Sequence, residues 1–258
     1  MKIAITGKGG VGKTTLSSTL ARVFAAEGYR VIAVDADPDA NLASAIGFPA
    51  DEKARPLADM KDLVEERTGM KPGTSGGFFI LNPKVDDIPD KFSIEFKGIK
   101  LLTMGTVDTG GAGCVCAEHV LLKNLIDHLV LRNKDVVIMD MEAGIEHLGR
   151  GTARAVDAFI VVVEPGARSV QTAEKVKQLA ADIGVNRVMV VGSKVRGEKD
   201  KQFIIDSLPN LDVVGFLSYN PEVVDADLAG ISPYDTSQIT VEEVKQIKEK
   251  ITAICAKK

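Results

Sequence analysis

Short apolar runs rich in Val and Ile alternate along the chain with stretches of helical periodicity. The apolar runs lie at residues 2–6, 30–37, 99–105, 135–140, 157–164, 187–194 and 211–217. The helical stretches lie at 14–28, near 116–132, and at 169–183, 199–207, 221–229 and 240–256. Strands that are apolar on both sides are typical of a parallel sheet whose two faces are both covered by helices. The pattern predicts an α/β fold, with a mostly parallel sheet flanked by helices on both faces.

One segment interrupts this alternation. Residues 66–98 hold much Gly, Pro and Asp and little helical periodicity, so we expect an irregular insertion there. At its end FSIEF and IKLL flank Lys97-Gly98, which predicts a small β-hairpin. Repeats, low-complexity tracts and linkers are not evident in the sequence, so a single domain over residues 1–258 is predicted.

Composition and charge narrow the classes of partner. The formal net charge of −4 gives no reason to expect nucleic acid. The longest apolar runs, VVIM and AFIVVV, are far shorter than the ~20 residues of a spanning helix, so no membrane partner is expected. Strand-like sequence from Lys2 argues against a signal peptide, and three cysteines are then expected to be reduced thiols. A cytoplasmic location is predicted.

A glycine-rich loop, GKGGVGKTT, follows the first strand and opens the first helix. It fits the G-x-x-x-x-G-K-[ST] spacing, in which glycines let backbone amides point at phosphate oxygens beside a helix N-terminus. The sequence therefore predicts a P-loop NTPase. Lys13 is expected to reach the β- and γ-phosphates, Thr14 to ligate Mg²⁺ and Thr15 to contact the α-phosphate. The expected phosphate-binding residues are Gly7, Gly9, Gly10, Val11, Gly12, Lys13, Thr14 and Thr15.

Acidic residues follow two of the predicted strands. Asp35 and Asp37 lie at the carboxyl end of the second strand, where ligands of open α/β sheets bind. The apolar run VVIM ends at Asp140, which is typical of a Walker B acid that holds Mg²⁺ through water. Asp35 is expected to be a second acid near Mg²⁺ or a structural acid. An acid at a strand end can also simply cap the next helix.

The stretch from Lys8 to Thr15 reads K-G-G-x-G-K-[ST]-[ST]. It resembles the loop of the deviant Walker-A ATPases, which include the nitrogenase iron protein and the septum-site and plasmid-partition ATPases. The resemblance implies an ATPase in which Lys8 crosses a homodimer interface to the partner's nucleotide. It also implies that Asp37 orients the attacking water and that Gly144 senses the γ-phosphate. Lys8, Lys13 and Asp37 are the expected catalytic residues.

The same resemblance addresses the nucleobase. Ser193 and Lys194 stand where the family usually carries Asn-Lys, so both are expected at the nucleotide, with Ser193 lacking the amide that usually contacts adenine. Pro221, in a late loop, is expected to flank the base. A guanine-reading N-K-x-D is not present, because Arg196 stands at the position of its Asp. ATP rather than GTP is therefore inferred from the family.

Two of the three cysteines, Cys114 and Cys116, lie one residue apart before a predicted helix. A helix N-terminus favours thiolate, the form that binds metal. Closed sites for borderline divalent ions need about four ligands. His119 would add a third within one chain, whereas two copies of the chain would give four thiolates on a dimer axis for Ni²⁺ or Zn²⁺. A Cys-x-Cys pair can also be incidental.

Two further stretches narrow the resemblance: D-x-E-A-G-I-E-H at residues 140–147 and V-E-P-G-x-R-S at 163–169. With the Cys-x-Cys pair, they resemble the CO dehydrogenase accessory ATPases of the CooC type and their acetyl-CoA synthase relatives, over essentially the whole chain. The resemblance implies ATP-dependent insertion of nickel into a client enzyme, CO dehydrogenase or acetyl-CoA synthase. ATP would close the dimer and hydrolysis would open it.

Two other functions fit parts of the sequence. An electron-transfer ATPase would share a [4Fe–4S] cluster between subunits, although that family uses widely separated cysteines. A positioning ATPase would bind membrane or DNA. The amphipathic stretch at 240–256 mixes Glu with Lys on its polar face, which favours docking against the sheet over membrane binding.

Overall fold

The computed structural model describes the chain except residues 53, 72–79, 106–116, 130–133, 143–155 and 257–258. The strands form one eight-stranded sheet in the order β3-β4-β2-β5-β1-β6-β7-β8, parallel except for β3. Their bounds are β1 Lys2–Gly7, β2 Arg30–Ala36, β3 Ile94–Phe96, β4 Ile99–Thr103, β5 Asp135–Met141, β6 Ala158–Val163, β7 Val188–Val195 and β8 Asp212–Ser218. The α/β class predicted from the sequence is confirmed.

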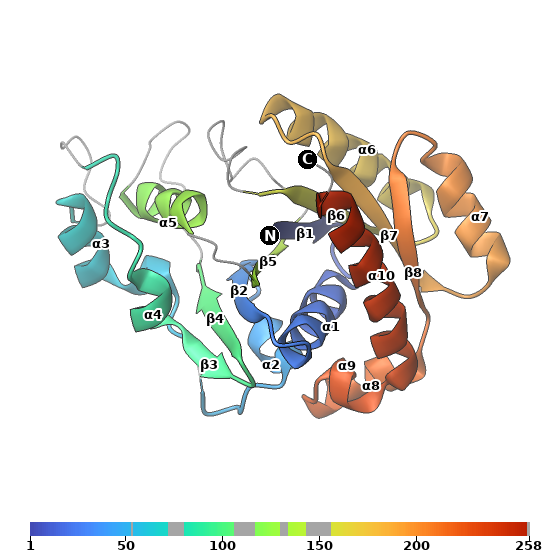
Figure 1. Cartoon of the computed structure of the whole chain (residues 1–258), viewed down its shortest axis with the longest axis horizontal. Helices are drawn as coiled ribbons and strands as arrows, with labels where there is room; N and C mark the ends of the chain where they lie inside the picture. Colours follow the sequence, from blue (N-terminus) through green and yellow to red (C-terminus); the bar gives the residue numbers. More distant parts are fainter. Residues whose placement is uncertain (53, 72–79, 106–116, 130–133, 143–155, 257–258) are drawn as a thin grey trace.

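Helices cover the sheet (Figure 1). The longer ones are α1 Lys13–Ala26, α3 Lys61–Thr68, α5 Ala117–His128, α6 Ala167–Asp182, α7 Glu198–Ser207, α8 Pro221–Ala229 and α10 Gln238–Ala256. The short ones are α2 Leu42–Ile46, the 3₁₀ turn η1 Leu57–Asp59, α4 Ile88–Phe92 and α9 Pro233–Thr236. No helix within the described parts of the chain is both long enough and apolar enough to cross a bilayer.

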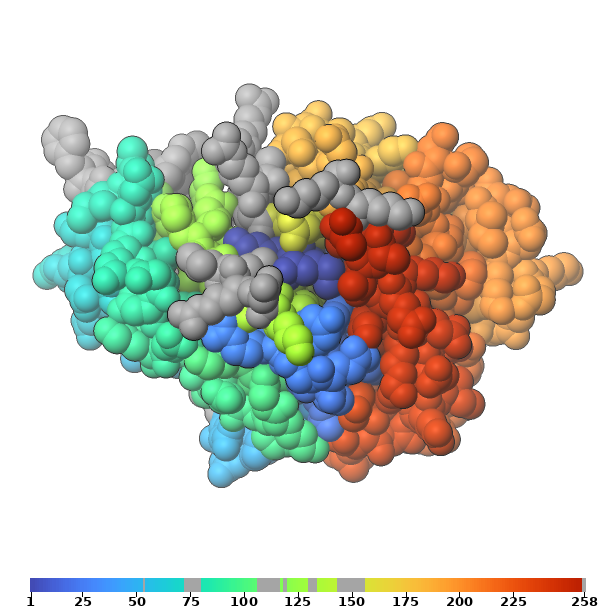
Figure 2. Space-filling view, in the orientation of Figure 1, coloured from blue at the N-terminus to red at the C-terminus, as the bar shows by residue number. Residues whose placement is uncertain are grey.

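Alternate residues of each central strand face opposite layers. In β1, Ile3 and Ile5 belong to one apolar cluster, with α1, α2 and α10, whereas Ala4 belongs to another, with α3, α5, α6 and α7. All six residues of β1 are buried. Near-continuous apolar strands are needed here because both faces are excluded from water. Figure 1 shows α1 and α10 side by side, and the space-filling view shows α10 against the N-terminal elements (Figure 2).

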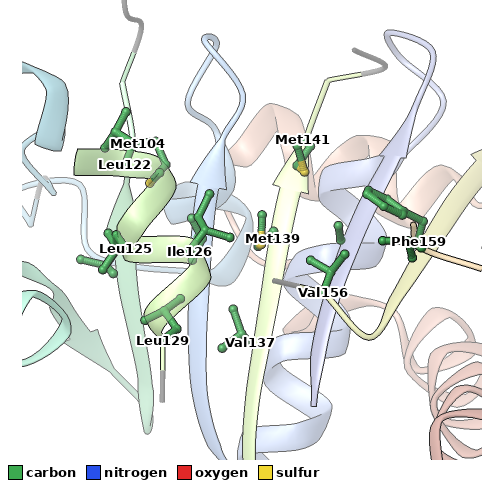
Figure 3. Packing of buried hydrophobic residues seen from close by; sticks show 14 of the residues in the cluster. Met104, Leu122, Leu125, Ile126, Leu129, Val137, Met139, Met141, Val156 and Phe159 are labelled. Carbon is green, nitrogen blue, oxygen red and sulfur yellow. The ribbon is translucent and has the colours of Figure 1, made fainter. Parts of the chain in front are cut away.

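The second layer is seen closely at α5 (Figure 3). Ile126 of this helix lies on the side toward Val137 and Met139 of β5, and Leu122 and Leu125 belong to the same buried cluster. The spacing 122, 125, 126, 129 repeats with the period of a helix, so one side of α5 is apolar. Burial of this side holds α5 against the part of the sheet formed by β4, β2 and β5.

The predicted hairpin is confirmed. Strands β3 and β4 pair antiparallel, and Phe96 lies opposite Ile99. The two turn residues between them, Lys97 and Gly98, have φ values of 48° and 77°. Positive φ at both positions is the conformation that matches the twist of a two-residue hairpin.

Within 66–98 the structure differs from the irregular stretch expected there. The last turn of α3 enters it, and α4 occupies Ile88–Phe92. Helix α4 begins with Ile88 and has Pro in its first turn, a favourable place for proline. Because α2, α4 and α9 have only four or five residues, they show no helical period in the sequence.

The hairpin turn gives a stability prediction. Gly98→Ala should lower the free energy of unfolding by about 1 kcal/mol, because an L side chain strains the left-handed backbone. No described heavy atom lies within 4 Å of a Cβ placed at Gly98, so the cost is conformational. Urea denaturation measures it. Gly98→Asn is the matched control and should lose less, since Asn tolerates this conformation. Equal losses in the two variants would contradict the assignment.

Candidate nucleotide-binding site

The glycine-rich loop connects the end of β1 at Gly7 to the start of α1 at Lys13. Gly10 and Gly12 have φ values of 76° and 98°, which strain any other residue. A Cβ on Gly7 would lie 2.5 Å from the carbonyl oxygen of Val162, so the tight packing of β1 on β6 also requires glycine. The loop has the strand-loop-helix setting that the sequence predicted, beside the N-terminus of a 14-residue helix.

The loop lysine and the second-strand acid are brought together. Lys13 is only 7% exposed, and its Nζ lies 3.8 Å from Oδ2 of Asp37. Oδ1 of Asp37 accepts a hydrogen bond from the amide of Asp39 at 3.0 Å. The ammonium of Lys13, which can bind a terminal phosphate, and the carboxylate of Asp37, which can bind an attacking water, therefore lie next to each other.

Asp140 lies near the end of β5, the strand that pairs with β2. It is 1% exposed, its Oδ1 accepts a hydrogen bond from the Ser17 hydroxyl at 3.1 Å, and the Thr14 hydroxyl lies nearby. Burial raises the pKa of Asp140 to about 6. The hydroxyls of Thr14 and Ser17 favour the charged form and offset part of this rise. The oxygens of Thr14 and Asp140 are the donor type that Mg²⁺ prefers, so these residues fit a magnesium ion.

Asp35 lies directly beside Asp140 in the β2–β5 register. Its Oδ2 accepts from the amide of Leu42 at 2.9 Å, and its Oδ1 accepts from that of Asp37 at 3.3 Å. Burial raises its pKa to about 7, partly offset by these amides. Since both oxygens hold the backbone of the segment from Asp37 to α2, the geometry favours the structural role for Asp35 over a place in the Mg²⁺ shell.

A cleft of about 560 Å³ opens beside the loop, a volume suited to a nucleotide. Residues expected from the sequence that line it are Gly10, Gly12, Lys13, Thr14, Thr15 and Lys194. Its other lining residues are Asn41, Ser44, Ala45, Val223, Val224, Asp227, Gly230, Ile231 and Pro233. The sequence analysis missed these, although their elements α2 and α8 follow the carboxyl ends of β2 and β8, where such ligand sites form.

Of the residues expected near the base, Lys194 lines the cleft, whereas Ser193 and Pro221 do not. Lys194 has a φ of 55°, and its Nζ donates to the carbonyl oxygen of Gly10 and lies 3.9 Å from Oε2 of Glu164. Ser193 is buried behind the loop, since a Cβ on Gly12 would lie 3.0 Å from its Oγ. Ser193 is not among the lining residues, and neither is Pro221, which begins α8.

The remaining predicted site residues are placed as follows. Lys8 is half-buried, Gly9 is exposed and Val11 is fully buried beneath the loop. Cys114, Cys116, Gly144 and the side chain of His119 lie outside the described residues. No cluster of three or more His, Cys, Asp or Glu suited to a metal occurs in the described part of the chain.

Comparison with known proteins decides the family. Residues 2–234 match the family of CobQ/CobB/MinD/ParA nucleotide-binding domains. The chain belongs to this family. Its sequence is 50% identical over 239 residues to the carbon monoxide dehydrogenase accessory protein CooC of Rhodospirillum rubrum, covering 92% of this chain and 90% of that protein. It is 47% identical over 250 residues to an uncharacterised ATP-binding protein of Methanocaldococcus jannaschii, covering 96% of each.

Solved structures agree in fold. The septum site-determining protein MinD of Pyrococcus horikoshii, complexed with Mg-ADP, has a TM-score of 0.66 at 21% identity, covering 100% of each chain. A ParA family ATPase from Chlorobium tepidum has a TM-score of 0.71 at 15% identity, covering 97% of each chain. The CooC-type resemblance inferred from the sequence is thus confirmed, and the chain is an ATPase of this family.

The buried Asp35 predicts a dependence of stability on pH. Its pKa of about 7 in the folded protein exceeds the ordinary value of 3.8, so the folded state binds more protons between these values. The stability that Asp35 contributes is full below pH ~4 and lost as pH rises through 7. Asp35→Asn should flatten this decline, although it also removes one amide acceptor. Urea midpoints between pH 5 and 7.5 in EDTA measure it, and parallel curves for the two proteins would refute the assignment.

Proposed function

We propose that the chain is an ATP-dependent, dimerising metallochaperone that helps insert nickel into CO dehydrogenase or acetyl-CoA synthase. The observation that carries the proposal is the half-identical sequence shared with the CooC accessory protein over almost the full length of both chains. A distant likeness to MinD and ParA proteins concerns the fold alone. The phosphate loop, the cleft and the buried acids supply the ATP-dependent part of the proposal.

At the nucleotide site each residue has a distinct role. The loop amides and Lys13 bind the β- and γ-phosphates, and Asp37 orients the attacking water. Thr14 and Asp140 hold Mg²⁺, which offsets the negative charge of the phosphates when it is bound. Lys13 and Asp37 lie 3.8 Å apart in the structure. Phosphate oxygens compete with Asp37 for the ammonium, so ATP binding releases the carboxylate for its contact with water.

We assign to Lys8 the contact that makes dimerisation depend on ATP. Its half-buried side chain lies in the same loop as Lys13, and no carboxylate of the described residues forms an ion pair with it. A second cation is not needed for a loop that already holds Lys13. The arrangement supports a role for Lys8 at the nucleotide of the partner subunit, where it links ATP binding to closure of the dimer.

The cargo site is assigned to Cys114 and Cys116. Helix α5 begins at Ala117, immediately after this pair. Two copies provide four thiolates, a complete set for Ni²⁺ or Zn²⁺, without a further ligand such as His119. Closure on ATP would form this set and hydrolysis would open it, which gives the metal a route to the client enzyme.

Metal titration tests the cargo site. The full chain with ATP should bind about half a nickel ion per chain as a dimer, because two chains share each ion. A Cys114→Ala/Cys116→Ala variant should lose this binding and keep most of its ATPase activity. Equilibrium dialysis with metal analysis and light scattering measure both quantities.

The matched control is Cys255→Ala, which removes the remaining thiol, in α10. It should bind nickel as the wild type does. One metal per monomer that survives the double substitution would contradict the proposal. A brown protein that absorbs near ~400 nm would instead indicate an iron–sulfur cluster.

Substitution of Lys8 tests the dimer. Lys8→Ala should abolish ATP-dependent dimerisation and lower hydrolysis about a thousandfold, the scale of a cation supplied in trans to a transferring phosphate. ADP affinity measured by calorimetry should change little, because Lys13 and the loop amides remain. Lys199→Ala, at an exposed position of α7, is the control and should behave as wild type. Loss of ADP binding by the Lys8 variant, with dimerisation intact, would reverse the assignment.

A further inference from the structure

Two adjacent serines of α1 are completely buried and differ in what they contact. Ser17 and Ser18 are both 0% exposed. Among the described residues, Oγ of Ser18 hydrogen-bonds within its own helix, donating to the carbonyl oxygen of Thr15 at 3.2 Å. Oγ of Ser17 lies 2.9 Å from the carbonyl oxygen of Lys13 and 3.1 Å from Oδ1 of Asp140. Of these two serines, it is therefore Ser17 that contacts Asp140 of β5.

Ser17 cannot reach a nucleotide itself. It has no exposed surface and is not among the residues that line the cleft. Its position one helical turn after Lys13 puts it on the same side of α1 as that lysine. Any effect on ligands of the cleft must therefore pass through the carboxylate that it touches.

The Asp140 carboxylate has two hydroxyl partners, Thr14 and Ser17. The Thr14 hydroxyl lines the cleft and fits the metal, so one of its lone pairs is committed when Mg²⁺ binds. The Ser17 hydroxyl has no exposed surface, and its one proton is shared between the carbonyl oxygen of Lys13 and Oδ1 of Asp140. Its contact with Oδ1 restricts rotation of the carboxylate, which orients the other oxygen toward the metal's water shell.

We infer that Ser17 is a positioning residue for magnesium, which holds the carboxylate of Asp140 in the orientation that supports the metal. The inference rests on the proposal that Asp140 holds Mg²⁺. It concerns neither the cysteine pair nor the client enzyme. A side chain that fixes a metal-supporting carboxylate typically contributes a factor of about 10 to 100 in metal affinity.

The test uses the full chain and a fluorescent ADP analogue, with Mg²⁺ as the titrant. In Ser17→Ala the Mg²⁺ concentration for half-maximal tightening of ADP binding should rise about tenfold. ADP binding in EDTA should match that of wild type. Mn²⁺ bound to the protein–ADP complex, measured by electron paramagnetic resonance, should weaken by the same factor. Ser17→Thr keeps the hydroxyl and should restore both values.

Ser18→Ala is the matched control, because it removes an equally buried hydroxyl that does not touch Asp140. It should leave the Mg²⁺ midpoint at the wild-type value. An unchanged midpoint in Ser17→Ala, or equal shifts in the two serine variants, would overturn the inference. A wild-type protein whose ADP affinity ignores Mg²⁺ would overturn the metal role of Asp140 as well. Thermal melting of each variant in EDTA verifies that both fold.

Discussion

Burial of two carboxylates on neighbouring strands is the constraint on which the site depends. Asp35 and Asp140 are paired in register and each is 1% exposed. An ionised carboxyl group in an apolar sheet is costly unless hydrogen bonds satisfy it. Backbone amides offset part of this cost for Asp35, and hydroxyls of α1 offset part of it for Asp140. The loop before α1 and the segment after β2 are thereby fixed relative to the sheet, which places Lys13 beside Asp37.

The cleft that results has different chemistry at its two ends. The loop residues and Lys13 line one side of the cleft, whereas Val223, Val224 and Ile231, together with Asp227, line the side formed by α8 and the turn after it. A nucleotide has the same asymmetry, with charged phosphates at one end and a flat apolar ring at the other. The apolar side chains of α8 therefore suit the ring end of such a ligand, and Asp227 adds a polar group beside them.

The sequence predicts those parts of this arrangement that follow from local pattern. Every main strand was found within one or two residues of its observed bounds, because a strand buried on both faces has an apolar run that few other structures require. The loop was found because its glycines have backbone geometry that only glycine adopts freely. Ser17 and Asp227 were not found, since their roles depend on neighbours distant in sequence. Asp35 stayed ambiguous until both of its amide donors were seen.

Helix α1 connects the two ends of the cleft. It begins in the phosphate loop, and near its other end the buried guanidinium of Arg22 donates to both carboxylate oxygens of Asp235, at 3.1 and 2.7 Å, and to the carbonyl oxygen of Ile46 at 2.8 Å. These contacts bind the end of α2 and helix α9, next to Pro233 at the cleft, to one rigid element. Close packing transmits displacement rather than absorbing it. Helix α1 therefore couples the phosphate loop mechanically to the end of α2 and to α9.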